Sequence, residues 1–360
     1  MTPILHHPHR ILVTGGAGFI GTNFLHLIVP KLPETTIVNL DKLTSAGNLQ
    51  NLQKIENATN YTFVHGDICD LDLLQRLFAK YQFTTVVHFA AESHVDRSIH
   101  SPIEFVQSNV VGTTSLLQVA KDSWDQPPSN ISKHRFLHVS TDEVFGALGV
   151  TGKFSTDTPY APRSPYAASK AGADHLVRAY AETYNLPIII SNCSNNYGPY
   201  QFPEKLIPLA IVRALGMDRI PVYSKGENVR DWLHVQDHCN ALMRILQYGI
   251  CGETYLVGGS EEYSNLELLR ILLSIVDEEL GRPSGSSLDL ITFVKDRPGH
   301  DFRYAIDASK LGTELGWTPN HGISEGLRAT VQWYLSNESW LQAVMDESYR
   351  TYLKTQYTSI

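Results

Sequence analysis

The chain has 360 residues, of which 42% are hydrophobic and 18% are charged, as in an ordinary globular enzyme. Its formal net charge of −8 argues against binding to nucleic acid through a basic surface. No apolar run is long enough to span a bilayer, and the first residues lack the charged start and apolar core of a signal peptide. We therefore expect a cytoplasmic protein that does not act at a membrane. The four cysteines are scattered without the spacing of a metal site, so we expect no bound metal.

The first predicted unit is residues 11–21, which read ILVTGGAGFIG. Its apolar start predicts a buried parallel strand, and the apolar periodicity that follows predicts a helix. Between them lie Gly15, Gly18 and Gly21, which let the backbone approach phosphate groups closely, and the helix N-terminus adds free N–H groups. A strand, a glycine turn and a helix in this order predict the pyrophosphate site of a dinucleotide.

The second predicted strand, residues 36–40, ends at Asp41, which lies twenty residues beyond Gly21. A carboxylate at this place accepts hydrogen bonds from the ribose hydroxyls of adenosine and repels a 2′-phosphate, which favours NAD over NADP. The alternative is an aspartate that only caps a loop.

Four further strands are predicted at residues 61–64, 84–89, 136–139 and 186–191, and helices are predicted at 71–78 and 102–120. Strands that alternate with helices in this way form parallel sheets covered on both faces. The sequence therefore predicts an α/β fold with a Rossmann-type, doubly wound parallel sheet.

Several residues that follow these strands are candidates for binding. Asp67 is expected either to contact the adenine or to close a turn. The small Ala90 and Ala91 would let a flat cofactor lie against the backbone, and Ser93 is expected to contact the substrate. The neighbouring Asp96-Arg97 is at least as well explained as a structural ion pair.

The candidate catalytic residues lie at the end of one strand and at the start of one helix. Residues 140–143, STDE, follow the strand at 136–139, and ligands of parallel α/β sheets bind at the carboxyl ends of strands. Tyr166 and Lys170 are four residues apart on a helix that runs to about Tyr184, so they share one face. A lysine beside a phenol favours the phenolate and lowers its pKa. A surface tyrosine–lysine pair is the alternative.

The second half of the chain shows weaker alternation of strands and helices. Residues 192–208 are dense in polar, aromatic and proline residues, which predicts an ordered binding loop. Short strands are predicted at 220–223 and 253–257, a helix at 266–280, and a helical, peripheral segment over about the last twenty residues. Arg230 and Arg297 are expected in loops, where two arginines suit a diphosphate, with surface salt bridges as the alternative.

Three motifs, GGAGFIG, STDEVFG and YAASK, together resemble the extended short-chain dehydrogenase/reductase superfamily. Within it, DKLTSAGNL, HGDICD, AAESHVDRSI and NNYGPYQFPEKLIP are similar to the dTDP-glucose 4,6-dehydratase family, and the similarity runs from about Arg10 to Trp317. The resemblance implies a hydro-lyase that converts dTDP-glucose to dTDP-4-keto-6-deoxyglucose and water by internal hydride transfer through bound NAD. A nucleotide-sugar 4-epimerase, or a dehydratase that acts on UDP- or CDP-glucose, is the alternative.

The resemblance also implies a role for each catalytic candidate. Tyr166, held as phenolate by Lys170, would take the proton of the sugar 4-hydroxyl, and Thr141 would bind the C4 oxygen. Glu143 would remove the C5 proton, and a protonated Asp142 would assist departure of the C6 hydroxyl. Two adjacent carboxyls with opposite roles need different protonation states, which mutual repulsion and burial provide.

Further site residues follow from the family's motifs. The residues expected at NAD are Gly15, Gly18, Phe19, Ile20, Gly21, Asp41, Lys42, Leu43, Thr44, Asp67, Ile68, Ala90, Ala91, Glu92, Ser93, Ser108, Tyr166, Lys170 and Asn196. Those expected at the sugar nucleotide are Ser93, Thr141, Asn195, Lys205, Leu206, Pro221, Val222, Tyr223, Arg230, Asn265, Asp296, Arg297, Pro298, Gly299 and His300.

The resemblance implies two domains and a homodimer. Residues 1–192 would form the NAD-binding Rossmann domain with the catalytic residues. Residues 193–360 would form a smaller, mixed α/β domain that mainly binds the sugar nucleotide, with some segments returning to the Rossmann sheet. Two copies would meet through a four-helix contact made by residues 102–120 and 167–184.

Overall fold

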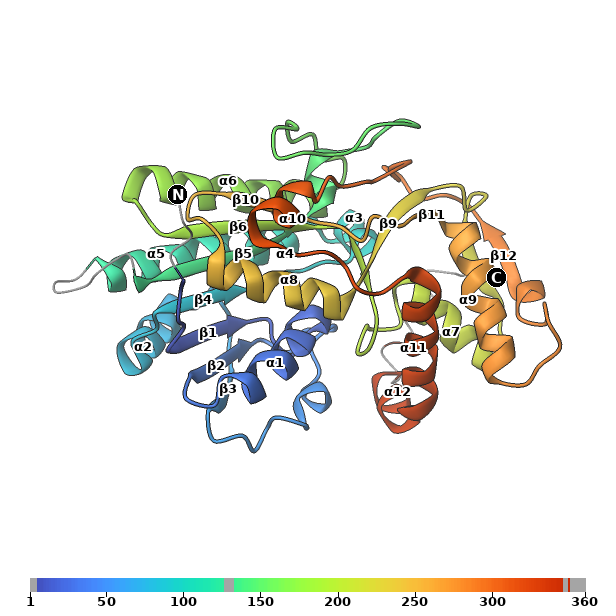
Figure 1. The fold of residues 1–360 in the computed structure, drawn as a ribbon, viewed down its shortest axis with the longest axis horizontal. Coiled ribbons are helices and arrows are strands. Elements are labelled where there is room, and N and C mark those ends of the chain that lie inside the picture. Colours follow the sequence, from blue (N-terminus) through green and yellow to red (C-terminus); the bar gives the residue numbers. More distant parts are fainter. Residues whose placement is uncertain (1–4, 126–132, 346–348, 350–360) are drawn as a thin grey trace.

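The computed structural model describes residues 5–125, 133–345 and 349 (Figure 1). A sheet of seven strands has the order β10-β6-β5-β4-β1-β2-β3, and every neighbouring pair in it is parallel. Its strands are β1 (Arg10–Thr14), β2 (Thr36–Asp41), β3 (Tyr61–His65), β4 (Thr85–His88), β5 (Arg135–Thr141), β6 (Ile188–Cys193) and β10 (Thr254–Val257). The strand order reverses between β1 and β4, so the predicted doubly wound Rossmann-type fold is confirmed.

Helices cover both faces of this sheet because successive side chains of each strand point to opposite faces. In β1, Ile11 and Val13 pack into one core with Phe24 of α1, whereas Leu12 packs into another core with Leu74 of α2. The helices around this sheet are α1 (Phe19–Lys31), α2 (Leu71–Tyr81), α5 (Thr113–Trp124), α6 (Pro165–Tyr184), α8 (Val235–Tyr248) and α10 (Ser309–Leu315). Two apolar layers, one on each face, explain why these strands read as continuous apolar runs.

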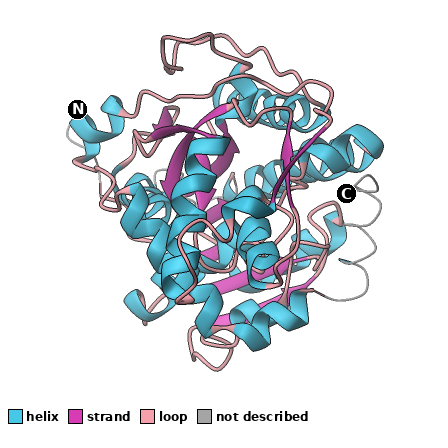
Figure 2. Ribbon diagram, turned by 90° about the vertical axis from the view of Figure 1, so that its right-hand side faces the viewer, coloured by secondary structure: helices cyan, strands magenta, loops and turns pink. Residues whose placement is uncertain are grey.

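The rest of the chain forms a second lobe with its own hydrophobic core, at the right of Figure 1 and toward the viewer in Figure 2. Its helices are α7 (Leu206–Leu215), α9 (Asn265–Glu279), α11 (Ile323–Ser336) and α12 (Glu338–Val344). Its small sheets are β11-β9-β7, formed by Glu262–Ser264, Val229–His234 and Asn195–Tyr197, and β12-β8, formed by Ile291–Val294 and Ile220–Tyr223. Strand β10 and helices α8 and α10, although late in the chain, belong with the large sheet.

The segment predicted as one helix over residues 102–120 is interrupted. The structure has α3 (Val95–His100), α4 (Pro102–Phe105), a π-helical stretch η2 (Val106–Gly112) and then α5. The Thr113 hydroxyl donates to the carbonyl oxygen of Asn109 at 2.6 Å, and such bonds back to the fourth preceding residue bend a helix. The Asn109 side chain meanwhile holds both the N–H and the carbonyl of Glu92. A wide turn at this place sets Asn109 against the strand ends, and π turns often mark functional sites.

The structure corrects the predicted conformation of Arg230, and most of the predicted C-terminal helical segment lies outside the described residues. Arg230, expected in a loop, lies in β9, which pairs with β7 and β11, so long-range pairing decides its conformation. Of the predicted C-terminal helical segment, α12 ends at Val344, and the residues after 345 lie outside the described part of the chain except Tyr349, whose side chain is buried. Among the described residues, no helix combines the length and the hydropathy that crossing a membrane requires.

The described residues also form the 3-10 turns η1 (Leu49–Leu52), η4 (Asp142–Phe145) and η5 (Leu288–Leu290). The loop after Asp41 runs into the 3-10 turn η1. The domain boundary at residue 192 stays a prediction.

Candidate active site

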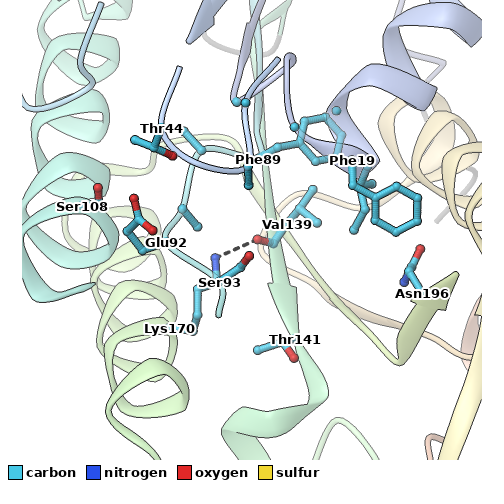
Figure 3. Close-up of a pocket in the computed structure, with 18 of the residues that line it drawn as sticks. Phe19, Thr44, Phe89, Glu92, Ser93, Ser108, Val139, Thr141, Lys170 and Asn196 are labelled. Atoms are coloured by element: carbon cyan, nitrogen blue, oxygen red, sulfur yellow. Dashed lines mark hydrogen bonds between the residues drawn. The ribbon is translucent and has the colours of Figure 1, made fainter. Parts of the chain in front are cut away.

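A large pocket lies at the carboxyl edge of the seven-stranded sheet (Figure 3). It is lined by Phe89, Val139 and Cys193, which lie near the carboxyl ends of the neighbouring strands β4, β5 and β6. The space between its walls measures about 1610 Å³ with the open solvent at its mouth included. Its wall extends from the glycine turn after β1 to Lys205, just before α7, so residues from both halves of the chain face one site.

Most of the residues predicted at the cofactor line this pocket. They are Gly15, Gly18, Phe19, Ile20, Gly21, Asp41, Lys42, Thr44, Asp67, Ile68, Ala90, Ala91, Glu92, Ser93, Ser108, Tyr166, Lys170 and Asn196. Leu43 does not line it; its N–H donates to Asp41 Oδ1 at 2.8 Å, and its backbone has a positive φ of 56°. Leu43 therefore acts on the shape of the loop after β2.

The glycine turn tolerates no side chain at two of its positions. Gly15 has a φ of +73°, and a Cβ there would lie 2.5 Å from the backbone nitrogen of Ala90. A Cβ on Gly21 would lie 2.3 Å from the carbonyl oxygen of Gly15. Gly18, the residue before α1, gives that helix no side-chain cap, so the helix N-terminus is open to an anion in the pocket.

The structure leaves room for both predicted roles of Asp41, as a loop cap and as a ligand of the ribose. Its Oδ2 accepts a hydrogen bond from Ala17 N–H and its Oδ1 from Leu43 N–H, both at 2.8 Å, so it does hold the loop. Each carboxylate oxygen has a second lone pair, and the side chain also lines the pocket. The structure thus leaves the carboxylate able to bind a ribose.

Asp67 closes a turn, as the alternative interpretation had it. Its Oδ1 accepts from Cys69 N–H at 2.9 Å, and its Oδ2 pairs with Lys42 Nζ at 2.8 Å. The N-terminus of α2 is capped by Asp70. The Asp67–Lys42 pair nevertheless stands in the pocket wall, and a contact of Asp67 with the adenine stays a prediction.

All five catalytic candidates line the other end of the pocket. Thr141 is the last residue of β5, and Asp142 and Glu143 follow in η4, where the Thr141 hydroxyl accepts from Glu143 N–H at 3.3 Å. Tyr166 and Lys170 lie on α6, which begins at Pro165 after Ser164 caps it. A strand end and a helix start thus bring a hydroxyl, two carboxyls, a phenol and an amine together.

Comparisons with known proteins agree with this geometry. The family model for GDP-mannose 4,6 dehydratase matches residues 12–330. The dTDP-glucose 4,6-dehydratase of Xanthomonas campestris is 54% identical over 94% of this chain and 97% of its own, and that of Neisseria meningitidis is 52% identical over 95% and 97%. This chain belongs to the dTDP-glucose 4,6-dehydratase family.

Solved structures extend the agreement to the fold and, within the dTDP-glucose 4,6-dehydratases, to the cofactor. DesIV of Streptomyces venezuelae, a dTDP-glucose 4,6-dehydratase crystallised with NAD and dTDP, has a TM-score of 0.84 and 44% identity over 93% of this chain and 99% of its own. A UDP-glucuronic acid 4-epimerase of Bacillus cereus has a TM-score of 0.79 with 27% identity over 91% and 99%. The family predicted from the sequence motifs is confirmed.

The pocket also suits NAD on chemical grounds. The glycine turn and the open N-terminus of α1 suit a pyrophosphate, and the Asp41 carboxylate suits a ribose. Among the described residues, the buried Ser194 Oγ and Asn195 Oδ1 have no hydrogen-bond partner, and both residues line the pocket. Buried polar atoms of this kind are rarely left unpaired, so they indicate a polar ligand.

The pKa values of both carboxyls are raised by burial, but their charged surroundings differ. Burial, and then repulsion by Glu143, raises the pKa of Asp142 well above its ordinary value, and Asp142 Oδ2 is buried without a partner within the described residues. Burial also raises the pKa of Glu143, but the positive charges of Arg297, Lys205 and Arg230 oppose that rise. Burial thus favours the neutral form of Asp142, which a general acid needs, and the three cations favour the charged form of Glu143, which a base needs.

The tyrosine–lysine pair differs from the prediction. Burial, and then the charge of Glu143, raises the pKa of the Tyr166 phenol, whereas a lowered pKa was expected. The Lys170 ammonium donates to the carbonyl oxygen of Val139 at 2.9 Å, and burial lowers its own pKa. A phenolate at Tyr166 therefore requires a neighbouring negative charge that favours the ammonium form of Lys170.

Four of the residues predicted at the substrate line this pocket: Ser93, Thr141, Asn195 and Lys205. Others form a charged group where the second lobe meets α3. Arg297 Nη1 pairs with Asp96 Oδ1 at 2.9 Å, and the Tyr223 hydroxyl donates to Asp96 Oδ2 at 3.1 Å. His300 packs edge-on against Tyr223 and pairs with Asp296 at 2.6 Å.

Asp96 and Arg97 do not pair with each other as the sequence alternative expected. Asp96 pairs with Arg297, and Arg97 pairs with Glu204 at 3.0 Å. Both partners lie beyond residue 192, so these ion pairs join the large sheet to the second lobe. Neighbouring residues of opposite charge had suggested a local pair, and the fold instead points them to distant partners.

The remaining predicted substrate residues do not line the pocket. Leu206 and Asn265 are the first residues of α7 and α9, Pro221 and Val222 belong to β8, and the Val222 side chain packs into the core of the second lobe. Pro298 and Gly299 follow Arg297, and Arg230 donates to the carbonyl oxygen of Asp301 at 3.0 Å and lies over the Tyr304 ring. The Val222 side chain is therefore turned into this core, and all of these assignments stay predictions.

The sequence analysis missed several residues that line the pocket. They are Leu40, Ala46, Gly47, Gly66, Phe89, Val139, Ser140, Cys193, Ser194, Gln201, Phe202 and Glu204. Phe89 follows β4, Val139 lies two residues before the end of β5, and Cys193 ends β6, so their place near strand ends was a usable signal. Glu204 lies within the loop predicted to bind, but no local feature marked it out.

Proposed function

We propose that this protein is a dTDP-glucose 4,6-dehydratase that forms dTDP-4-keto-6-deoxyglucose and water. The observation that carries the proposal is the meeting of the Asp142–Glu143 carboxyl pair with Thr141, Tyr166 and Lys170 in one pocket. A 4-epimerase only has to move a hydride at C4, and it has no use for an acid and a base beside C5 and C6. The similarity to named dehydratases over nearly the whole chain supports the same function.

Each residue then acts at a stated atom. Tyr166 accepts the proton of the sugar 4-hydroxyl as C4 is oxidised, and the Thr141 hydroxyl binds the C4 oxygen. When bound, NAD supplies the acceptor of the C4 hydride and its donor to C6. Because the resulting ketone acidifies the neighbouring carbon, Glu143 removes the C5 proton.

The elimination and the return step complete the balance of protons. Asp142 gives its proton to the C6 hydroxyl, which leaves as water, and a double bond forms between C5 and C6. After the hydride reaches C6, Glu143 returns its proton to C5. The proton held by Tyr166 replaces the one that Asp142 gave up, so the enzyme ends as it began.

The direct test is incubation of the purified protein with dTDP-glucose without added NAD, followed by mass analysis. The proposal predicts a product lighter by one water, with the ultraviolet absorbance that a keto sugar develops in alkali. An unchanged mass with conversion to the galactose epimer would instead establish an epimerase. UDP- and CDP-glucose in parallel samples measure how far the nucleotide is selected.

We also propose a homodimer in the cytoplasm. The described part of α4 and η2 exposes three apolar side chains, with Ile103 76%, Val106 45% and Val111 41% exposed, and α6 exposes Tyr184. Pairing with the same face of a second copy would cover them, since isolated apolar patches on one face favour association. Light scattering tests this: Ile103→Glu should yield monomers, whereas Val150→Glu, at an exposed loop residue, should not.

A further inference from the structure

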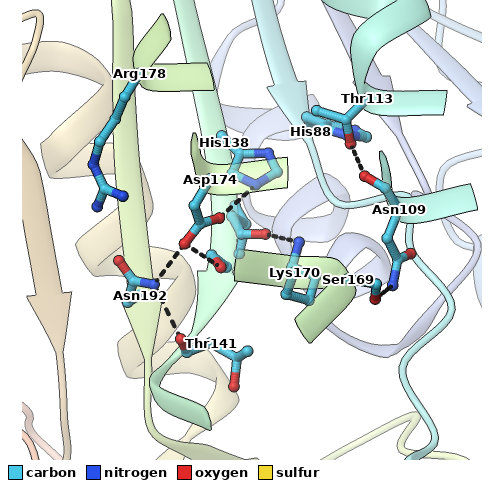
Figure 4. A network of polar contacts seen from close by, with 12 residues as sticks. His88, Asn109, Thr113, His138, Thr141, Ser169, Lys170, Asp174, Arg178 and Asn192 are labelled. Carbon is cyan, nitrogen blue, oxygen red and sulfur yellow. Dashed lines mark hydrogen bonds and ion pairs between the residues drawn. The ribbon is translucent and has the colours of Figure 1, made fainter. Parts of the chain in front are cut away.

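A buried carboxylate lies one helical turn beyond Lys170. Asp174 is 0% exposed and accepts four hydrogen bonds, of which those from His138 and Asn192 can be followed in Figure 4. Its Oδ1 accepts from His138 Nε2 at 3.0 Å. Its Oδ2 accepts from Ser140 Oγ at 2.9 Å, from the Tyr160 hydroxyl at 2.7 Å and from Asn192 Nδ2 at 3.1 Å. The donors come from β5, β6 and the loop before α6, so one side chain ties four parts of the chain together.

This carboxylate is connected to the catalytic strand end. Asn192 Nδ2, besides its bond to Asp174, donates to the carbonyl oxygen of Thr141 at 3.0 Å. Ser140 is the residue before Thr141 on β5. Asp174 therefore fixes how α6, which carries Tyr166 and Lys170, stands against the strand that carries Thr141 and leads into the carboxyl pair.

The same carboxylate is the nearest counter-charge along the helix face. Tyr166, Lys170, Asp174 and Arg178 recur every four residues, so they share one face of α6. Burial lowers the pKa of Lys170, and the charge of Asp174 is the main influence that opposes it. The Arg178 guanidinium donates to the Tyr160 hydroxyl at 2.8 Å and stacks over that ring.

Other titratable groups packed against this lysine and carboxylate contribute little charge. Burial lowers the pKa of His138 to about 4 and that of His88 well below its ordinary value, so both rings are neutral near pH 7. Burial also raises the pKa of the Cys193 thiol on β6, which stays neutral. Because a carboxylate only accepts, His138 carries its proton on Nε2.

We propose that Asp174 is a positioning residue for the dehydration, which sets the catalytic face of α6 against the end of β5 and supplies the counter-charge of the Lys170 ammonium. The proposal rests on the proposed function, because it assigns a residue to that reaction. Asp174 touches none of the reacting atoms and acts through Lys170, Ser140 and Asn192.

The test is Asp174→Asn, which removes the charge and nearly keeps the shape. The new amide nitrogen can donate to His138 Nε2 if the ring proton moves from Nε2 to Nδ1. In the wild type, Nδ1 is buried and has no hydrogen-bond partner among the described residues. We expect kcat to fall about tenfold or more with KM for dTDP-glucose little changed. We also expect the alkaline limb of the kcat–pH profile to move about one unit or more toward acid, since an opposite charge nearby shifts a pKa by that much.

A matched control separates positioning from general loss of stability. Asp277 is 1% exposed in the second lobe, where it accepts bonds from the N–H and hydroxyl of Ser287 and does not line the pocket. Asp277→Asn should lower Tm without moving the pH limb. The proposal is overturned if the alkaline limb of the kcat–pH profile lies at the same pH in Asp174→Asn as in the wild type, whatever the kcat of the variant.

A milder variant covers the case in which Asp174→Asn does not fold. Tyr160→Phe removes one donor to Asp174 and keeps the charge, so kcat should fall a few-fold with no acid shift of the limb. An unchanged kcat in this variant would contradict positioning. Failure of the proposed function itself is seen separately, because the wild-type protein would then form no keto sugar.

Discussion

The two ends of the pocket are held by different kinds of interaction. At the cofactor end, backbone groups set the shape of the pocket. Gly15 and Gly21 leave no room for a Cβ, and Asp41 accepts hydrogen bonds from two backbone N–H groups. Beside the substrate end, charged side chains meet across the two lobes in the pairs of Asp96 with Arg297 and of Arg97 with Glu204, and Glu204 lines the pocket itself. The first end is rigid and set locally, whereas the second depends on charges that an anionic ligand would compete for.

The largest effect should follow from a side chain in the glycine turn. Gly21→Val would place a Cβ 2.3 Å from the carbonyl oxygen of Gly15, where only backbone could move. We expect the purified variant to carry no NAD and to lose its activity, as measured by the absorbance of released cofactor and by product formation. Gly149→Ala is the control, because a Cβ there meets nothing within 4 Å. Normal NAD content in Gly21→Val would contradict the rigid cofactor end.

Loss of the base at C5 should stop the reaction part-way. Glu143→Gln should lower the rate of product formation by about 10²–10⁴-fold, the usual contribution of general acid–base catalysis. Oxidation at C4 should persist, so NADH absorbance should appear on adding dTDP-glucose while no water is lost. Glu34→Gln, at an exposed residue, should behave as wild type. Near-normal product from Glu143→Gln would show that another group is the base.

The substrate end should respond to loss of one cation. Arg297→Ala should raise KM for dTDP-glucose about tenfold or more, since hydrogen bonds to charged groups are worth about 1.5–3 kcal/mol. Because Arg297 is the first of the cations that hold down the pKa of Glu143, the acid limb of the rate–pH profile should also move to higher pH. Arg219→Ala, at an exposed residue of the same lobe, is the control. An unchanged KM would place the diphosphate elsewhere.

The smallest expected effect is a gain of stability. The pKa of Asp142 is raised in the folded protein, so the stability it contributes is present below its unfolded pKa of about 3.9 and is lost as pH rises through the folded value. At neutral pH, Asp142→Asn should therefore raise Tm by a few degrees while product formation falls. Thermal melts across pH check this.

The opposite sign is expected for a control carboxyl outside the pocket. Hydrogen bonds from Ser309 lower the pKa of Asp307, so its contribution is present at neutral pH and is lost in acid. Asp307→Asn should lower Tm slightly at neutral pH, with the difference vanishing as pH falls. A lower Tm for Asp142→Asn at neutral pH would mean that Asp142 is stably ionised.

The sequence predicted the cofactor end well because that end is built from consecutive residues. The run Ile11–Val13, the glycines after it and Asp41 each carry a local pattern that strands, turns and helices require. The catalytic strand end and helix start were found for the same reason, since 140–143 and 166–170 are short, contiguous motifs.

The rest depended on contacts that no local pattern encodes. Arg230 lies in a strand only because β7 and β11 pair with it, and the partners of Asp96 and Arg97 lie more than a hundred residues away. The Asn109 side chain, in the π-helical stretch, forms hydrogen bonds with Glu92 and Ser169, which are 17 and 60 residues away. The raised pKa of Tyr166 reflects its burial beside Glu143, which helical spacing to Lys170 does not report.

The measurement that tests the central claim most directly is the fate of the C4 hydrogen. The protein is given dTDP-glucose with deuterium at C4, without added NAD, and the product is examined by NMR and mass spectrometry. The account predicts a product that lacks one water and carries the deuterium at C6. Deuterium retained at C4 of an epimeric sugar would contradict the account and establish a 4-epimerase.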